Sequence, residues 1–158
     1  MVFTNVLLID RSVPDYEVFI NALNENTGVI LYSTETVNEL IDLIQEKTTV
    51  AVRLGIVFVH RPYLETDDLF FDLVQALNIT HVDFLACNLL NVKKWRDLFG
   101  RIQSLGVVVG ASNDCTGNLK YGGDWVMEST GEYIALVYFT RFIYYYTYLL
   151  EPSKLDSL

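Results

Sequence analysis

The sequence predicts an α/β fold, a three-layer sandwich with a central, mainly parallel sheet, followed by a C-terminal β-hairpin and a terminal aromatic helix. Three observations predict it. Short apolar runs alternate with segments whose apolar residues have helical spacing. The apolar runs are largely apolar on both faces, which is typical of parallel strands covered by helices. The alternation ends near Ala111, where a polar, glycine-bearing loop begins.

Five apolar runs are expected to form the strands of the sheet. Gly28 breaks the first helical segment before the second strand, and Gly106 stops the last helix before the fifth. The expected strands are Asn5–Ile9, Val29–Tyr32, Gly55–Val59, Val82–Ala86 and Val107–Ala111.

Four segments with helical spacing connect these strands. Pro14 fits the first turn of the first helix after a Ser12 cap. Either Thr34 or Thr36 caps the second helix. The expected helices are Asp15–Leu23, a helix with Val37, Leu40, Ile41 and Ile44 on its apolar face, Asp67–Leu77 and Val92–Leu105.

After Ala111 the sequence predicts a hairpin instead of another strand–helix unit. Trp125–Glu128 and Tyr133–Tyr138 flank a Ser-Thr-Gly turn, and Trp125 is expected to anchor the hairpin in the core. Asp114 in the preceding loop could bind a cation or a substrate amine. We prefer the interpretation that Asp114 and Asp124 bond to nearby backbone, as Asn and Asp in such loops usually do.

The nearly apolar segment Tyr133–Leu150 allows two interpretations. Its eighteen residues are at the short limit for a membrane span, and a central Arg141 would be costly there. We therefore expect a strand and then a helix, which docks on the body through a stripe of Phe139, Phe142, Ile143, Tyr146 and Leu150. The opposite stripe has residue types that are enriched at protein interfaces, although an ordinary exposed face is the alternative. That stripe consists of Arg141, Tyr144, Tyr145 and Tyr148.

Composition limits the classes of protein. The 158 residues are enough for one domain with a real core, expected as a body of residues 1–138 and an aromatic extension of residues 139–158 packed on it. A net charge of −9 argues against nucleic-acid binding. The N-terminus lacks the features of a signal peptide. We therefore expect a chain that is not secreted, lies in the cytoplasm or within a large assembly, and keeps both cysteines reduced.

No metal or cofactor is expected from the sequence. The two cysteines and two histidines show no close pairing, so the spacing of a metal site is absent.

Two expected strands lead into reactive side chains. Gly55–Val59 runs into His60, and Val82–Ala86 runs into Cys87. Successive parallel strands of a βαβ pair finish at the same edge of the sheet, where ligands bind. A thiol and an imidazole there are the ingredients of a Cys/His nucleophile pair. The plainer interpretation is a cysteine that packs as a small hydrophobic residue and a histidine bonded to neighbouring backbone.

Four segments also carry a resemblance to a known family. The family's third strand ends in Ser-His-Gly, and the corresponding residues here are Val59-His60-Arg61. Its fourth strand ends in Gly-Cys-Asn, and the corresponding residues here are Ala86-Cys87-Asn88. Residues 111–117 follow its Ala-Ser-x-Asp-x-Thr-Gly loop, and residues 122–131 follow its Gly-Gly-Asp-Trp-x-Leu-Glu hairpin with a Thr-Gly turn. Over about residues 5–138 the chain resembles the bacterial domain of unknown function 4347, whose fold looks like that of caspases and haemoglobinases.

The resemblance implies a set of catalytic roles and also suggests that they have been lost. Cys87 would be the nucleophile and His60 would promote proton transfer, with the N–H groups of Cys87 and Arg61 holding the oxyanion. Arg61 replaces the family's glycine, and Pro62 has no N–H to donate. The glycine-rich segment that normally follows is absent, which favours a vestigial pair.

Three functions follow as expectations. The first is a non-catalytic structural or docking module, a degenerate caspase-like domain that binds a protein partner through its C-terminal aromatic face. It would belong to a larger assembly, for example as a minor shell component of a virion. The alternative is a cysteine peptidase-type hydrolase using Cys87 and His60. A second alternative is membrane association through residues 133–150.

Overall fold

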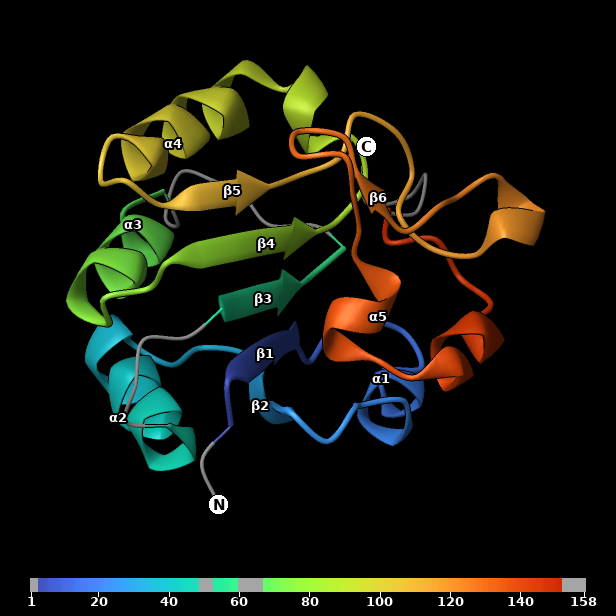
Figure 1. The fold of residues 1–158 in the computed structure, drawn as a ribbon, viewed down its shortest axis with the longest axis horizontal. Helices are drawn as coiled ribbons and strands as arrows, with labels where there is room; N and C mark the ends of the chain where they lie inside the picture. Colours follow the sequence, from blue (N-terminus) through green and yellow to red (C-terminus); the bar gives the residue numbers. More distant parts are fainter. Residues whose placement is uncertain (1–2, 49–52, 60–66, 152–158) are drawn as a thin grey trace.

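The computed structural model describes residues 3–48, 53–59 and 67–151, and shows an α/β three-layer sandwich around a five-stranded sheet (Figure 1). The strand order is β2-β1-β3-β4-β5, and every neighbouring pair is parallel. The predicted fold class is confirmed. The strands are β1 (Asn5–Asp10), β2 (Thr27–Tyr32), β3 (Arg53–Val57), β4 (His81–Leu85) and β5 (Val108–Gly110).

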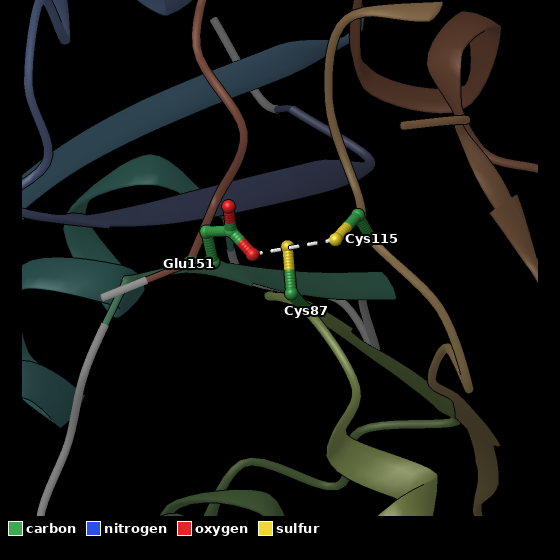
Figure 2. A group of neighbouring side chains, drawn as sticks. All are labelled: Cys87, Cys115 and Glu151. Atoms are coloured by element: carbon green, nitrogen blue, oxygen red, sulfur yellow. Dashed lines mark hydrogen bonds between the residues drawn. The ribbon is translucent and has the colours of Figure 1, made fainter. Parts of the chain in front are cut away.

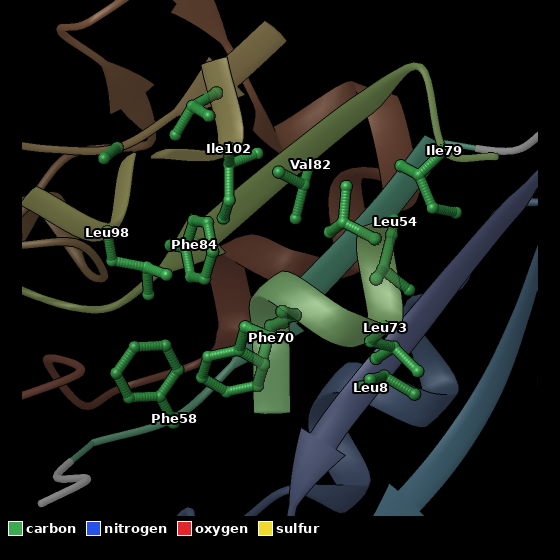
Figure 3. Close-up of a cluster of buried hydrophobic side chains, with 14 of the residues drawn as sticks. Leu8, Leu54, Phe58, Phe70, Leu73, Ile79, Val82, Phe84, Leu98 and Ile102 are labelled. Atoms are coloured by element: carbon green, nitrogen blue, oxygen red, sulfur yellow. The ribbon is translucent and has the colours of Figure 1, made fainter. Parts of the chain in front are cut away.

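Three helices cover one face of the sheet: α2 (Val37–Lys47), α3 (Asp67–Ala76) and α4 (Lys93–Gln103). Their apolar residues pack with one side of the strands into a large buried cluster (Figure 3). Thr36, one of the two predicted caps, begins α2 in a capping box with Glu39.

The second face is covered by short elements from both ends of the chain. These are α1 (Glu17–Asn21), the antiparallel pair β6 (Val126–Met127) and β7 (Glu132–Tyr133), α5 (Ala135–Tyr138) and the 3₁₀ helix η4 (Arg141–Tyr145). Trp125 is buried beside Phe19, with the ring centroids 6.4 Å apart, so the predicted hairpin anchor is confirmed. Two further 3₁₀ turns, η2 (Leu89–Asn91) and η3 (Leu119–Tyr121), lie in the connections.

The first helix begins later than predicted. Ser12 does not cap it, because its N–H and hydroxyl both donate to Asp10 Oδ1. This local turn occupies the chain before Pro14, and α1 starts only at Glu17.

The C-terminal aromatic segment differs from the expected strand and helix. The second hairpin strand, expected over Tyr133–Tyr138, ends at Tyr133, and Ala135–Tyr138 forms the short helix α5. The helix expected after residue 138 is only the short 3₁₀ helix η4. Thr140 separates α5 from η4 with an extended backbone, and its N–H donates to Ala22 O at the end of α1. This tertiary bond replaces a helical one. Phe139, Ile143, Tyr146 and Leu150 are buried as predicted, whereas Phe142 is 61% exposed, contrary to the prediction.

No helix among the described residues combines the length and the apolar character needed to cross a membrane.

Candidate functional site

β3 and β4 are neighbours and end at the same edge of the sheet, as the sequence predicts. Val57 pairs with Leu85, and Phe58 N donates to Leu85 O beyond the last pair. Cys87 follows β4 at this edge. The other two predicted catalytic residues, His60 and Arg61, lie outside the described residues, so the Cys/His pair stays a prediction.

The backbone of Cys87 is bonded to the C-terminal end of the described chain. Its N–H donates to Leu150 O at 2.9 Å. Leu150 belongs to the segment Tyr148–Glu151, which we call the C-terminal strap. The N–H that the resemblance assigns to an oxyanion therefore has a partner within the chain.

The sulfur of Cys87 packs against the loop of residues 111–117. Thr116 N donates to Cys87 Sγ at 3.2 Å, and the Cys87 thiol in turn donates to Thr116 O at 3.6 Å. Burial raises the pKa of Cys87 well above its usual value. Because the thiolate is the nucleophile, a raised pKa makes the residue a poor one at neutral pH.

The polar residues of this loop serve its own structure. The side-chain oxygen of Thr116 lies 3.3 Å from Ala86 O and 3.1 Å from Ser112 Oγ. Thr116 and Ser112 are both fully buried. Asn88 N donates to Asp114 O, which joins the loop to the end of β4. These bonds satisfy buried polar groups and fix the position of Cys115 and Thr116.

Two glycines of the family motifs let the C-terminal strap approach the loop. Gly117 has a φ of +141°, and a Cβ there would lie 2.6 Å from Tyr148 O. A Cβ on Gly123 would lie 2.6 Å from the Leu149 side chain. The strap pairs with the loop through a bridge between Gly117 and Leu149 and through Leu150 N, which donates to Thr116 O at 2.8 Å.

The strap also brings a carboxylate to two thiols. Cys87, Cys115 and Glu151 point toward one another from three separate segments (Figure 2). Cys115 Sγ donates to Glu151 Oε2 at 3.4 Å, and the two sulfur atoms and one carboxylate oxygen all lie within 4.8 Å of one another. Both cysteines are free thiols. Burial and the Glu151 hydrogen bond raise the pKa of Cys115.

Asp114 and Asp124 form an acidic group with Glu128 beside this cluster. Asp124 Oδ1 accepts from Val126 N, as the preferred interpretation of the sequence predicts. Glu128 accepts from Asn113 N. Burial, and then repulsion from Glu128, raises the pKa of Asp114.

A buried charge network on the second face of the sheet was missed from the sequence. Asp83 is fully buried and accepts from Arg53 Nε at 2.7 Å and from the Tyr138 hydroxyl at 2.5 Å. His81 Nε2 lies 3.2 Å from the same carboxylate, and Arg53 also contacts Glu132. The sequence does contain one indication of this network, because Asp83 lies within an apolar strand and a buried carboxylate requires a partner.

The predicted interface residues are all exposed to solvent. Tyr145 is 72% exposed, and Arg141, Tyr144 and Tyr148 are also exposed. Phe142 joins them, with its ring centroid 5.8 Å from that of Tyr145. Arg141, Phe142, Tyr144 and Tyr145 line an open, shallow hollow, and we call these four residues the aromatic face.

Comparison with known proteins places the chain in a family. No curated protein and no solved structure matches it. The model of the family described as "Domain of unknown function (DUF4347)" matches residues 6–149, which confirms the resemblance. The match runs past residue 138, where the sequence motifs suggested that it ends, and into the C-terminal strap. The chain therefore belongs to the DUF4347 family.

Proposed function

We propose that this chain is a non-catalytic structural or docking module, a degenerate caspase-like domain that works within a larger assembly, of which a virion shell is one example. One observation carries the proposal: the N–H of Cys87 donates to Leu150 O of the C-terminal strap.

Acyl transfer by a cysteine requires a reactive thiolate and free donors for the developing oxyanion. At Cys87 the amide donor is bonded to the strap, and the sulfur is held between the N–H and carbonyl of Thr116. Burial raises the pKa of the thiol and so disfavours the thiolate. Each of these features lowers the reactivity of Cys87 in the strap-bound state.

The docking role is supported by the aromatic face. Exposed tyrosine and arginine side chains offer contact area at a low cost in conformational entropy and recur at interaction hot spots. The rings of Phe142 and Tyr145 pack against each other at a tilt of 33°, and both side chains stay largely exposed beside Arg141. A protein partner with apolar side chains for the rings and a carboxylate for Arg141 fits this surface.

The first test measures the reactivity of Cys87 in a Cys115→Ser background. We expect iodoacetamide at neutral pH to alkylate Cys87 about tenfold or more slowly in the folded chain than in urea, because the thiol is buried and protonated. His60→Ala is expected to leave the rate unchanged. Rapid stoichiometric labelling that is lost in His60→Ala would support the cysteine peptidase instead.

The second test asks whether the aromatic face contacts a partner in the native cell. A photo-reactive phenylalanine analogue at position 145 is expected to cross-link to a partner protein, because Tyr145 is highly exposed. The same analogue at Gln45, which is exposed on α2 over the other face of the sheet, is the matched control. Equal cross-linking from both positions, or none from position 145, would contradict docking through this face.

A further inference from the structure

Two thiols and a carboxylate lie close together where the C-terminal strap meets the body of the domain. Cys87 follows β4, Cys115 belongs to the loop before the hairpin, and Glu151 ends the described chain. Their Sγ, Sγ and Oε atoms lie within 4.8 Å of one another, and Cys115 Sγ lies 3.4 Å from Glu151 Oε2. The ligand atoms around a tetrahedral Zn²⁺ are separated by about 3.5–3.8 Å, given bond lengths near 2.0–2.3 Å.

We propose that Cys87, Cys115 and Glu151 form a binding site for a soft divalent cation of the zinc class, with the fourth coordination position left for water or an external ligand. Two thiolates select Zn²⁺ over hard cations such as Mg²⁺ and Ca²⁺, which prefer oxygen. A carboxylate completes the mixed sulfur and oxygen ligand set that zinc accepts. The site goes beyond the docking role and is independent of it.

Hydrogen bonds within the chain already hold the three proposed ligands in place. Cys87 N donates to Leu150 O, and Thr116 N donates to the Cys87 sulfur. In metal sites, hydrogen bonds from neighbouring groups to the ligands fix the orientation of those ligands, and the bond from Thr116 N to the Cys87 sulfur is of this type. Cys115 O accepts from Asp124 N at 3.0 Å, and the neighbour of Glu151 is fixed by the bond from Leu150 N to Thr116 O.

A bound cation would connect the strap to the body of the domain. Glu151 is the ligand from the strap, and the two cysteines come from segments that are already bonded to each other through Asn88 N and Asp114 O. Because the unfolded chain does not hold these groups together, metal binding would stabilise the folded state.

Cobalt is the probe that reads the ligands directly. The chain, kept reduced with a phosphine, is titrated with Co²⁺. We expect one Co²⁺ per chain, with the visible bands of tetrahedral coordination and the ultraviolet charge-transfer band of cobalt–thiolate bonds. Zn²⁺ is expected to remove both signals, because it binds thiolates more tightly than Co²⁺ does. Zn²⁺ is also expected to raise the thermal midpoint of the chain.

Single substitutions distinguish the three ligands from their surroundings. Cys87→Ser and Cys115→Ser are each expected to lower the charge-transfer intensity per cobalt by about half and to abolish the stabilisation by Zn²⁺. Glu151→Gln is expected to keep the band and weaken Co²⁺ binding about tenfold. Glu128→Gln, in the adjacent acidic group, is the matched control and is expected to change neither.

Two results would overturn the proposal. One is the absence of a thiolate band in the folded, reduced chain at saturating Co²⁺. The other is Co²⁺ binding that persists in both cysteine variants and is lost in Glu128→Gln, which would place the metal on Asp114, Asp124 and Glu128. Circular dichroism of each variant tests whether the fold is retained, so that loss of the cobalt–thiolate band can be distinguished from unfolding.

Discussion

Asp83→Asn is expected to lower the free energy of unfolding at neutral pH by about 3 kcal/mol, because it removes one partner of a buried ion pair. Asp83 is fully buried and accepts from Arg53 and Tyr138. The neutral amide keeps the size of the side chain but leaves the Arg53 charge less well compensated. Glu132 also contacts Arg53, so part of the compensation remains.

The loss is expected to depend on pH. Burial alone would raise the pKa of Asp83, but the interactions with the nearby His81 and Arg53 side chains outweigh it and hold the pKa below its usual value. A carboxylate whose pKa is lowered on folding stabilises the protein above its unfolded pKa of about 3.9. That contribution is lost as the pH falls through the folded pKa. The difference between wild type and Asp83→Asn should therefore be largest above about pH 5 and shrink in acid.

Urea unfolding across this pH range measures the effect, with Tyr138→Phe as the comparison. The phenylalanine removes the hydroxyl that donates to Asp83 and keeps the ion pair, so we expect a loss of about 1.5–3 kcal/mol. The Tyr138→Phe loss is expected to be smaller than that of Asp83→Asn at neutral pH. Equal unfolding free energies for wild type and Asp83→Asn at pH 7 would show that the buried charge contributes no stability.

The sheet and its helices could be predicted because their signals are local. A short apolar run or an apolar stripe at helical spacing carries its own evidence, and the five strands lie close to their predicted positions. The C-terminal segment also had helical spacing. It is interrupted because Thr140 N bonds to Ala22 O, more than a hundred residues earlier in the sequence. Spacing contains no information about that competing acceptor.

The candidate site was predictable only where it depends on strand ends. The position of Cys87 after β4 follows from the order of strands and helices. Its meeting with Cys115 and Glu151 does not, because the three residues come from distant segments and show no metal-site spacing. Asp83 is intermediate: a carboxylate in an apolar strand requires a partner, but only the fold shows that Arg53 and Tyr138 provide it.

Gly117→Ala is expected to detach the C-terminal strap and to lower the free energy of unfolding by about 2–3 kcal/mol. The backbone of Gly117 has a φ of +141°, which L side chains rarely adopt. The added methyl group would also lie 2.6 Å from Tyr148 O, a backbone atom that cannot move without shifting the strap. The strain and the clash therefore act on the same contact.

Urea unfolding and the alkylation rate of Cys87 in a Cys115→Ser background measure the two consequences. Leu150 O covers the Cys87 amide, so a displaced strap should expose the thiol and increase its alkylation several-fold. Gly100→Ala makes the same chemical change on α4, where nothing lies within 4 Å of the new methyl group. It is expected to stabilise the chain by about 0.5–1 kcal/mol and to leave Cys87 protected, because alanine favours a helix more than glycine does. If Gly117→Ala lowered stability without raising the reactivity of Cys87, the strap would not be what shields the thiol.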